Sequence, residues 1–138
     1  MSKQMMIAAL CIAMACIAVA ETRIWSGGNG LWHDAASWTP VGAPKVGEMV
    51  VISAGTVTLT NATPWLSGVT LATGAKLHFG NGASNVLAAS EVSLAGTVTH
   101  AYNTALTTNS LGGWNVDGRV WVVCSNLTVT GTINADYC

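Results

Sequence analysis

The chain has 138 residues, which is enough for one domain, and only 8% of them are charged. With five Lys and Arg in total and a formal net charge of −1, the sequence lacks the basic clusters that neutralise phosphates, which excludes a nucleic-acid-binding protein. Its four cysteines form no C-x-x-C pair and no Cys/His cluster, so the spacing gives no zinc site.

Residues 1–20 have the form of a cleaved signal peptide. Lys3 supplies the positive start, residues 5–20 are apolar, and Ala18-Val19-Ala20 fits the small-x-small cleavage pattern. The apolar run is shorter than the roughly 20 residues of a membrane span. We therefore predict export to a secreted or cell-surface location, with membrane contact only through the leader. The remaining chain has four basic and six acidic residues, a net charge of −2.

Residues 21–48 are rich in tryptophan, glycine and proline. Trp25, Trp32 and Trp38 are interleaved with glycines and followed by Pro40 and Pro44. Glycine permits backbone conformations that other residues avoid, and proline fixes φ and removes a donor. The composition predicts an irregular, aromatic-filled entrance that caps the structure that follows.

From residue 49 the sequence becomes a series of short strands. Apolar residues alternate with Thr or Ser in a pattern of period two. Four corner glycines separate these runs at intervals of 19, 22 and 35 residues, namely Gly55, Gly74, Gly96 and Gly131. The expected strands cover residues 50–52, 56–60, 69–71, 76–79, 92–94, 97–99, 120–123, 127–129 and 132–134.

Short strands at intervals of about 20 residues or more predict an all-β fold of the parallel β-helix (β-solenoid) type. Residues 49–138 would form its rungs, with an irregular loop at about 102–118. The chain stops just after a strand, which leaves the last rung uncovered. Either a partner covers that edge, for example by self-association, or the chain is the truncated amino-terminal part of a longer protein, which is the interpretation we favour.

The spacing W-x-G-G-x-G-x-W from Trp25 to Trp32, followed by Trp38, Gly42 and Pro44, resembles a known amino-terminal segment. That segment belongs to large secreted bacterial proteins of the autotransporter-associated β-strand-repeat and pectate-lyase-like types, and the part after Trp38 is similar to the start of a G8-type domain. Ser37 and Glu48 depart from the usual Asn and Asp of these patterns. The resemblance implies a right-handed parallel β-helix and a surface or secreted role, and it carries over no catalytic residue.

The entrance tryptophans Trp25, Trp32 and Trp38 are the candidate carbohydrate-binding residues, because an aromatic face suits the apolar face of a pyranose. Their setting among glycines favours packing over binding. We expect Trp65, Trp114 and Trp121 to be packing residues as well.

No catalytic residue is assigned. His33, Asp34 and Ser37 contain the residue types of a triad, but a triad is defined by geometry and not by adjacency. Asp34, Asp117 and Asp136 are far apart in sequence, so the pattern gives no carboxylate pair, metal site or cofactor. Cys124 and Cys138 form a candidate disulfide in an oxidising compartment.

The sequence therefore predicts an exported, non-catalytic surface or adhesion-type module, with a polysaccharide or cell-surface glycan as candidate partner. Two alternatives stay open. The chain can be the entrance segment of a polysaccharide lyase or hydrolase, or a carbohydrate-binding module that uses the entrance tryptophans.

Overall fold

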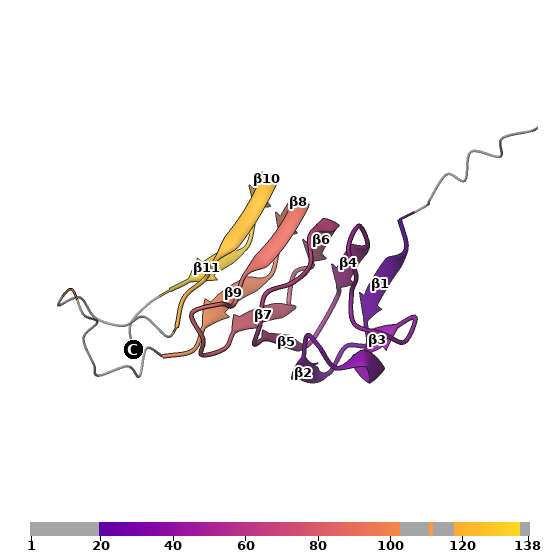
Figure 1. Ribbon diagram of the computed structural model, residues 1–138, viewed down its shortest axis with the longest axis horizontal. Coiled ribbons are helices and arrows are strands. Elements are labelled where there is room, and N and C mark those ends of the chain that lie inside the picture. Colours follow the sequence, from indigo (N-terminus) through magenta and orange to yellow (C-terminus); the bar gives the residue numbers. More distant parts are fainter. Residues whose placement is uncertain (1–19, 103–110, 112–117, 136–138) are drawn as a thin grey trace, which may run out of the picture.

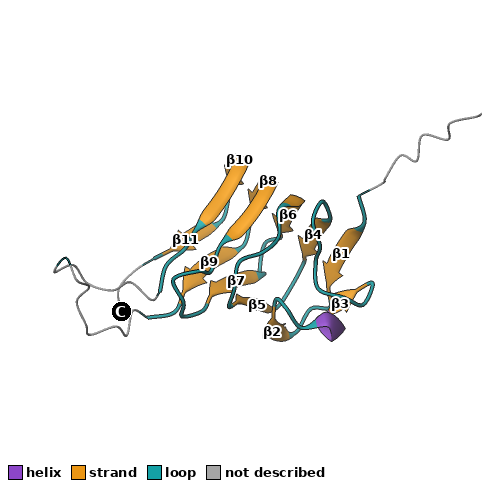
Figure 2. Cartoon of the chain, in the orientation of Figure 1, coloured by secondary structure: helices purple, strands orange, loops and turns teal. Residues whose placement is uncertain are grey.

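The computed structural model describes residues 20–102, 111 and 118–135. Strands dominate this part of the chain, together with one short 3-10 helix, η1 (Figure 2). In chain order the elements are β1 (Thr22–Trp25), β2 (Asn29–Leu31), η1 (Ala35–Ser37), β3 (Trp38–Thr39), β4 (Met49–Ile52), β5 (Thr56–Leu59), β6 (Leu66–Leu71), β7 (Lys76–Phe79), β8 (Leu87–Leu94), β9 (Thr97–His100), β10 (Val122–Val129) and β11 (Thr132–Asn134).

The strands form two sheets. Sheet A has six strands in the order β10-β8-β6-β4-β1-β3, and sheet B has five in the order β11-β9-β7-β5-β2. From β4 onward successive strands alternate between the two sheets (Figure 1). Strand β4 pairs in parallel with β1 and β5 with β2, and from β6 onward each strand pairs in parallel with the strand that came two places earlier. The exception is β3, which pairs antiparallel with β1 at the edge of sheet A.

The core lies between the inner faces of the two sheets. In sheet A, Val50, Val69 and Val92 stand in register on neighbouring strands. In sheet B the same is true of Val57, Leu77 and Val98, as the register of β5, β7 and β9 shows. All six side chains are buried. The neighbouring positions of the strands face outward, and most of these are Thr or Ser. Period-two alternation therefore sets which face of each strand is apolar.

The alternation of inward and outward residues in strand β8 shifts in the middle of the strand. Leu87, Ala89, Val92 and Leu94 are its buried positions, so the spacing between inward residues is two, then three, then two. Ser90 and Glu91 both lie outside the core at the point where the phase shifts. Strand β10 follows β8 in register along its whole length and carries the same shift.

The corners between the sheets stack on one another through backbone hydrogen bonds. Lys76 N donates to Gly55 O (2.8 Å), Thr97 N donates to the Ala75 oxygen (3.0 Å), and Thr132 N donates to Gly96 O (3.0 Å). At the corner between β6 and β7, the residue that stacks between Gly55 and Gly96 is thus Ala75. The corner residue expected from the sequence, Gly74, lies one position earlier. Gly74 has a φ of 85°, which explains why a glycine is required beside the column.

The predicted fold class, a right-handed parallel β-helix with an irregular cap, is wrong. The described chain forms a mixed six-stranded sheet and a parallel five-stranded sheet, with almost no helix. Residues 21–48 supply β1, β2 and β3 to these sheets rather than a cap outside them. The physical reason is that this segment satisfies its backbone groups in strand pairing, in parallel with β4 and β5 and antiparallel within itself.

The expected strands at residues 50–52, 56–60, 69–71, 76–79, 92–94, 97–99, 127–129 and 132–134 overlap observed strands β4 to β11. Residues 1–19 of the predicted leader, and most of the loop expected at about 102–118, lie outside the described residues.

Candidate functional site

The entrance tryptophans belong to the core. Trp25, Trp32 and Trp38 are 4%, 0% and 1% exposed. The ring of Trp38 meets the rings of Trp25 and Trp32 edge to face, with centroid distances of 5.0 and 5.2 Å. Trp38 Nε1 also donates to the Trp32 oxygen (2.8 Å). Protein covers the ring faces, so a sugar ring cannot stack on these three residues in this structure.

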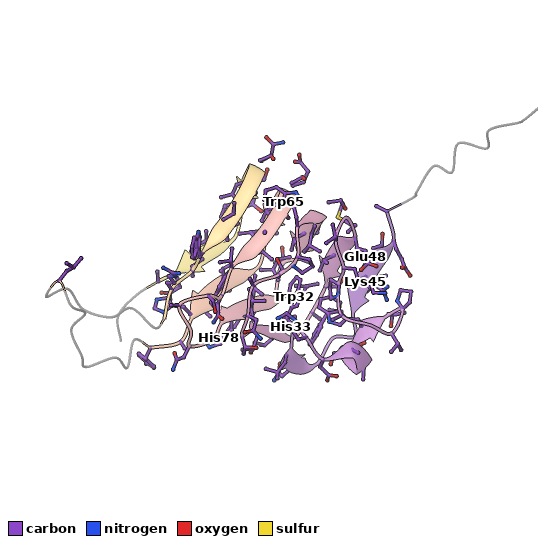
Figure 3. All side chains as sticks on the ribbon, viewed as in Figure 1. Trp32, His33, Lys45, Glu48, Trp65 and His78 are labelled. Atoms are coloured by element: carbon purple, nitrogen blue, oxygen red, sulfur yellow. The ribbon has the colours of Figure 1, made fainter. Side chains whose placement is uncertain are left out.

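A buried ion pair fixes the segment between β3 and β4 against β1. Arg23 Nε donates to Glu48 Oε2 (2.9 Å) and Arg23 Nη2 donates to Glu48 Oε1 (3.0 Å), a bidentate arrangement (Figure 3 labels Glu48). Arg23 Nη1 donates to the Pro40 oxygen (2.8 Å), and Glu48 Oε2 also accepts from Lys45 N (2.8 Å). The hydrogen bonds from Arg23 lower the pKa of the Glu48 carboxyl below its ordinary value of 4.5, although burial acts in the opposite direction. These charges are used to hold the fold together.

This ion pair predicts an acid-sensitive contribution to stability. Because the folded-state pKa of Glu48 is lowered, the pair stabilises the protein above about pH 4.5 and its contribution is lost as the pH falls through the lower folded pKa. Glu48→Gln is expected to lower the urea midpoint at pH 7 and to flatten its fall below pH 4.5. Glu21→Gln is the control, since Glu21 contacts the same guanidinium but is 51% exposed. Identical pH curves for Glu48→Gln and the unmodified protein would contradict this assignment.

Asp34 caps the short helix η1 and does not organise a catalytic triad. Its Oδ1 accepts from Ala36 N (3.1 Å), and its Oδ2 accepts from the Ser37 hydroxyl (2.9 Å). Both bonds satisfy groups of the turn itself, as expected for an Asp at the start of a helix. The carboxylate therefore holds Ser37 directly, whereas a triad needs a histidine between the two.

Two tryptophans that we expected to be packing residues are exposed instead. Trp65 and Trp121 are 46% and 42% exposed. Trp65 Nε1 donates to Ser90 Oγ (3.0 Å), which fixes the indole over the neighbouring strand β8 (Figure 3). The Arg119 guanidinium lies 4.1 Å from the ring centroid of Trp121, a cation–π contact that orients the second indole.

Trp65 and Trp121 lie on the same outer face of sheet A. Each immediately precedes a strand residue that faces the core, Leu66 in β6 and Val122 in β10. Strand β8 separates β6 from β10, and the register places Trp65 level with Val123, two residues beyond Trp121. From a strand spacing of about 4.8 Å and a rise of about 3.3 Å per residue, the backbones of the two tryptophans are about 12 Å apart. We call this surface the aromatic face and define it by Trp65, Ala88, Trp121 and Val123.

Polar groups border the aromatic face where the alternation of inward and outward residues in β8 and β10 shifts. Ser90 is held by Trp65, and Asn126 Nδ2 donates to Glu91 Oε1 (2.6 Å). Hydroxyl, amide and carboxylate groups therefore lie beside the exposed indoles.

The outer face of sheet B is different in character. Its strands carry Thr56, Lys76 and Thr97 in register, with His78 in the neighbouring row. Partial burial, together with the nearby Lys76 and His100, lowers the pKa of His78 below its ordinary value. Among the described residues, no three His, Cys, Asp or Glu side chains come together to hold a metal ion.

The candidate disulfide is only partly within the described residues. Cys124 lies half-buried on β10, and Cys138 lies outside them. The pairing of Cys124 with Cys138 stays a prediction.

The sequence contained a signal for the exposed tryptophans. In the run Trp65-Leu66 and again in Trp121-Val122, the second residue is the apolar one that the strand turns inward. A tryptophan directly beside an inward position must point outward, because successive side chains of a strand alternate between faces. Using this signal requires knowing which residues of the strand face inward, and the sequence alone leaves that open because each tryptophan lies one residue before the strand begins.

A comparison of the chain with protein-family models, with curated proteins and with solved structures finds no match. The resemblance to the amino-terminal segments of secreted bacterial proteins therefore stays a prediction. Within the part of the chain that the structure describes, no helix has the length and apolar character to cross a membrane.

Proposed function

We propose that this protein is an exported, non-catalytic adhesion-type module that binds a neutral polysaccharide or cell-surface glycan through the aromatic face. The observation that carries the proposal is the exposure of Trp65 and Trp121 on one side of sheet A, each fixed by a specific contact. Fixed, exposed aromatic rings lose little conformational entropy on binding and offer a large apolar area.

The charge distribution favours a neutral ligand. The chain outside the predicted leader has a net charge of −2, and it has only two lysines and two arginines. Arg23 forms an ion pair with Glu48. Arg119 lies against Trp121 and donates to the Ala83 oxygen. A sulfated or uronic-acid-rich polymer would need free cations on the aromatic face, and the described residues there offer none beyond Arg119.

The test is affinity electrophoresis of the purified protein in gels that contain neutral β-glucans, mannans or xylans, with pull-down on insoluble cellulose and chitin. Trp65→Ala and Trp121→Ala are each expected to weaken binding by about tenfold or more, the size of a central interface residue. Leu31→Ala is the matched control, because Leu31 is 50% exposed but belongs to β2 in the other sheet.

Two results would overturn the proposal. One is that no polysaccharide of the panel binds, and the other is that the double variant Trp65→Ala/Trp121→Ala binds as well as the unmodified protein. The same polymers are assayed for new reducing ends and for unsaturated products. Release of either would favour the enzyme alternative over a binding module.

A further inference from the structure

The two sheets end on an open edge that is apolar. Strands β10 and β11 are the last strands of sheets A and B, and no other described strand pairs with their outer edges. Leu127, Val129 and Ile133 stand at inward positions and are 49%, 43% and 42% exposed. The residues beneath them in register are buried (Val92, Leu94 and Val98). The core thus reaches this edge without being covered by a described strand.

Strand β10, the eight-residue edge of sheet A, lacks the charged residues and prolines that usually protect an edge from pairing with another strand. Natural edge strands carry Lys, Pro or inward-pointing charges that prevent such pairing. Residues 120–135 contain no charged residue and no proline. The opposite end of sheet A differs, because Arg23 and Glu48 are buried there and the last strand, β3, has two residues. An occupant of the open edge therefore meets no like-charge repulsion, even when the occupant is an identical strand.

The pattern of β10 is self-complementary. Its inward positions are Val122, Cys124, Leu127 and Val129, as set by the register with β8. These inward positions are separated by two, three and two residues, and the order of the separations is the same when the strand runs in the opposite direction. Antiparallel pairing centred between residues 125 and 126 places each inward residue opposite an inward residue of a second copy. A slip by one residue would set inward positions against outward ones, so the pattern selects this register.

We propose that two copies of this chain associate through β10 in antiparallel orientation, about a twofold axis between residues 125 and 126. Val122 then faces Val129 of the second copy, and Cys124 faces Leu127 of the second copy. Sheet A continues from one copy into the other, and the exposed inward side chains at the edge become part of one core. Twofold, self-complementary contacts of this kind are the commonest way in which identical chains associate. The inference does not depend on glycan binding.

The first test measures association directly. Sedimentation velocity of the purified full chain over a concentration series is expected to show a monomer–dimer equilibrium. Leu127→Lys introduces a charge into the interface from a half-exposed position and is expected to raise the dissociation constant at least about tenfold. Leu31→Lys, at an equally exposed position on β2, leaves the dissociation constant unchanged. A monomer at every concentration, or dissociation by Leu31→Lys and not by Leu127→Lys, would overturn the proposal.

The second test checks the register and does not require Leu127→Lys to fold. Opposite residues in an antiparallel pair have Cα atoms about 4.5–5.5 Å apart. A disulfide spans about 4.4–6.8 Å. In a Cys138→Ser background, Leu127→Cys is expected to give a covalent dimer on mild oxidation by copper phenanthroline. Adding Cys124→Ser to that protein abolishes the cross-link, whereas a cross-link that persists without Cys124 would contradict the register.

Discussion

Trp32→Ala is expected to lower the free energy of unfolding by about 3–5 kcal/mol, the usual cost of truncating a buried aromatic residue. Trp32 is fully buried and packs edge to face on Trp38. It follows β2 directly, and its N donates to the Thr58 oxygen (2.8 Å), so it lies beside Leu59 in the core. Among the described residues its Nε1 has no hydrogen-bond partner, so packing alone accounts for its contribution.

The measurement is urea unfolding followed by far-ultraviolet circular dichroism, which reports the loss of the two sheets. Trp65→Ala is the control, because Trp65 is largely exposed and its loss should change stability by no more than about 0.5 kcal/mol. A change of that small size in Trp32→Ala would show that Trp32 is not a core residue.

Gly55→Ala is expected to destabilise the protein by about 2–5 kcal/mol. Its φ is 78°, in the left-handed region that costs a non-glycine residue about 1–2 kcal/mol. A Cβ atom here would also fall within van der Waals distance of the Gly28 oxygen and 2.7 Å from the Gly27 oxygen. Both are backbone atoms of the stacked corner below, and forcing them apart costs about 1–3 kcal/mol more.

Gly74→Ala separates the two contributions. Gly74 has a similar φ of 85°, but a Cβ atom would meet nothing within 4 Å. Gly74→Ala is therefore expected to lower the free energy of unfolding only by the conformational cost of about 1–2 kcal/mol. The difference between the two variants in urea unfolding measures the steric cost of the corner. Equal losses would mean that the corners are not packed against one another as described.

The strands were predictable where the local pattern and the tertiary environment agree. Thr56 to Leu59 and Thr97 to His100 alternate with a clear period of two, and each became a strand with its valine in the core. The entrance was not predictable in this way. Glycine and proline dominate its composition, and its strands form because β4 and β5 offer partners that are distant in sequence.

The candidate site shows the same division. The sequence favoured packing for Trp25, Trp32 and Trp38, and the structure buries them. It also favoured packing for Trp65 and Trp121, and there the prediction was wrong, since both are exposed. Residue type indicates that a tryptophan contributes apolar area. Only the phase and register of the strand decide whether that area meets the core or the solvent.

The buried Arg23 has a consequence for the size of any assembly. Arg23 stands in register with Val50 and heads the row of inward residues in sheet A. A further subunit stacked on that end would have to place its own apolar residues against a guanidinium already committed to Glu48. Unlimited head-to-tail polymerisation needs two compatible ends. Among the described residues only the β10–β11 end is of this kind, so the association that we propose would close as a pair and would not extend into a filament.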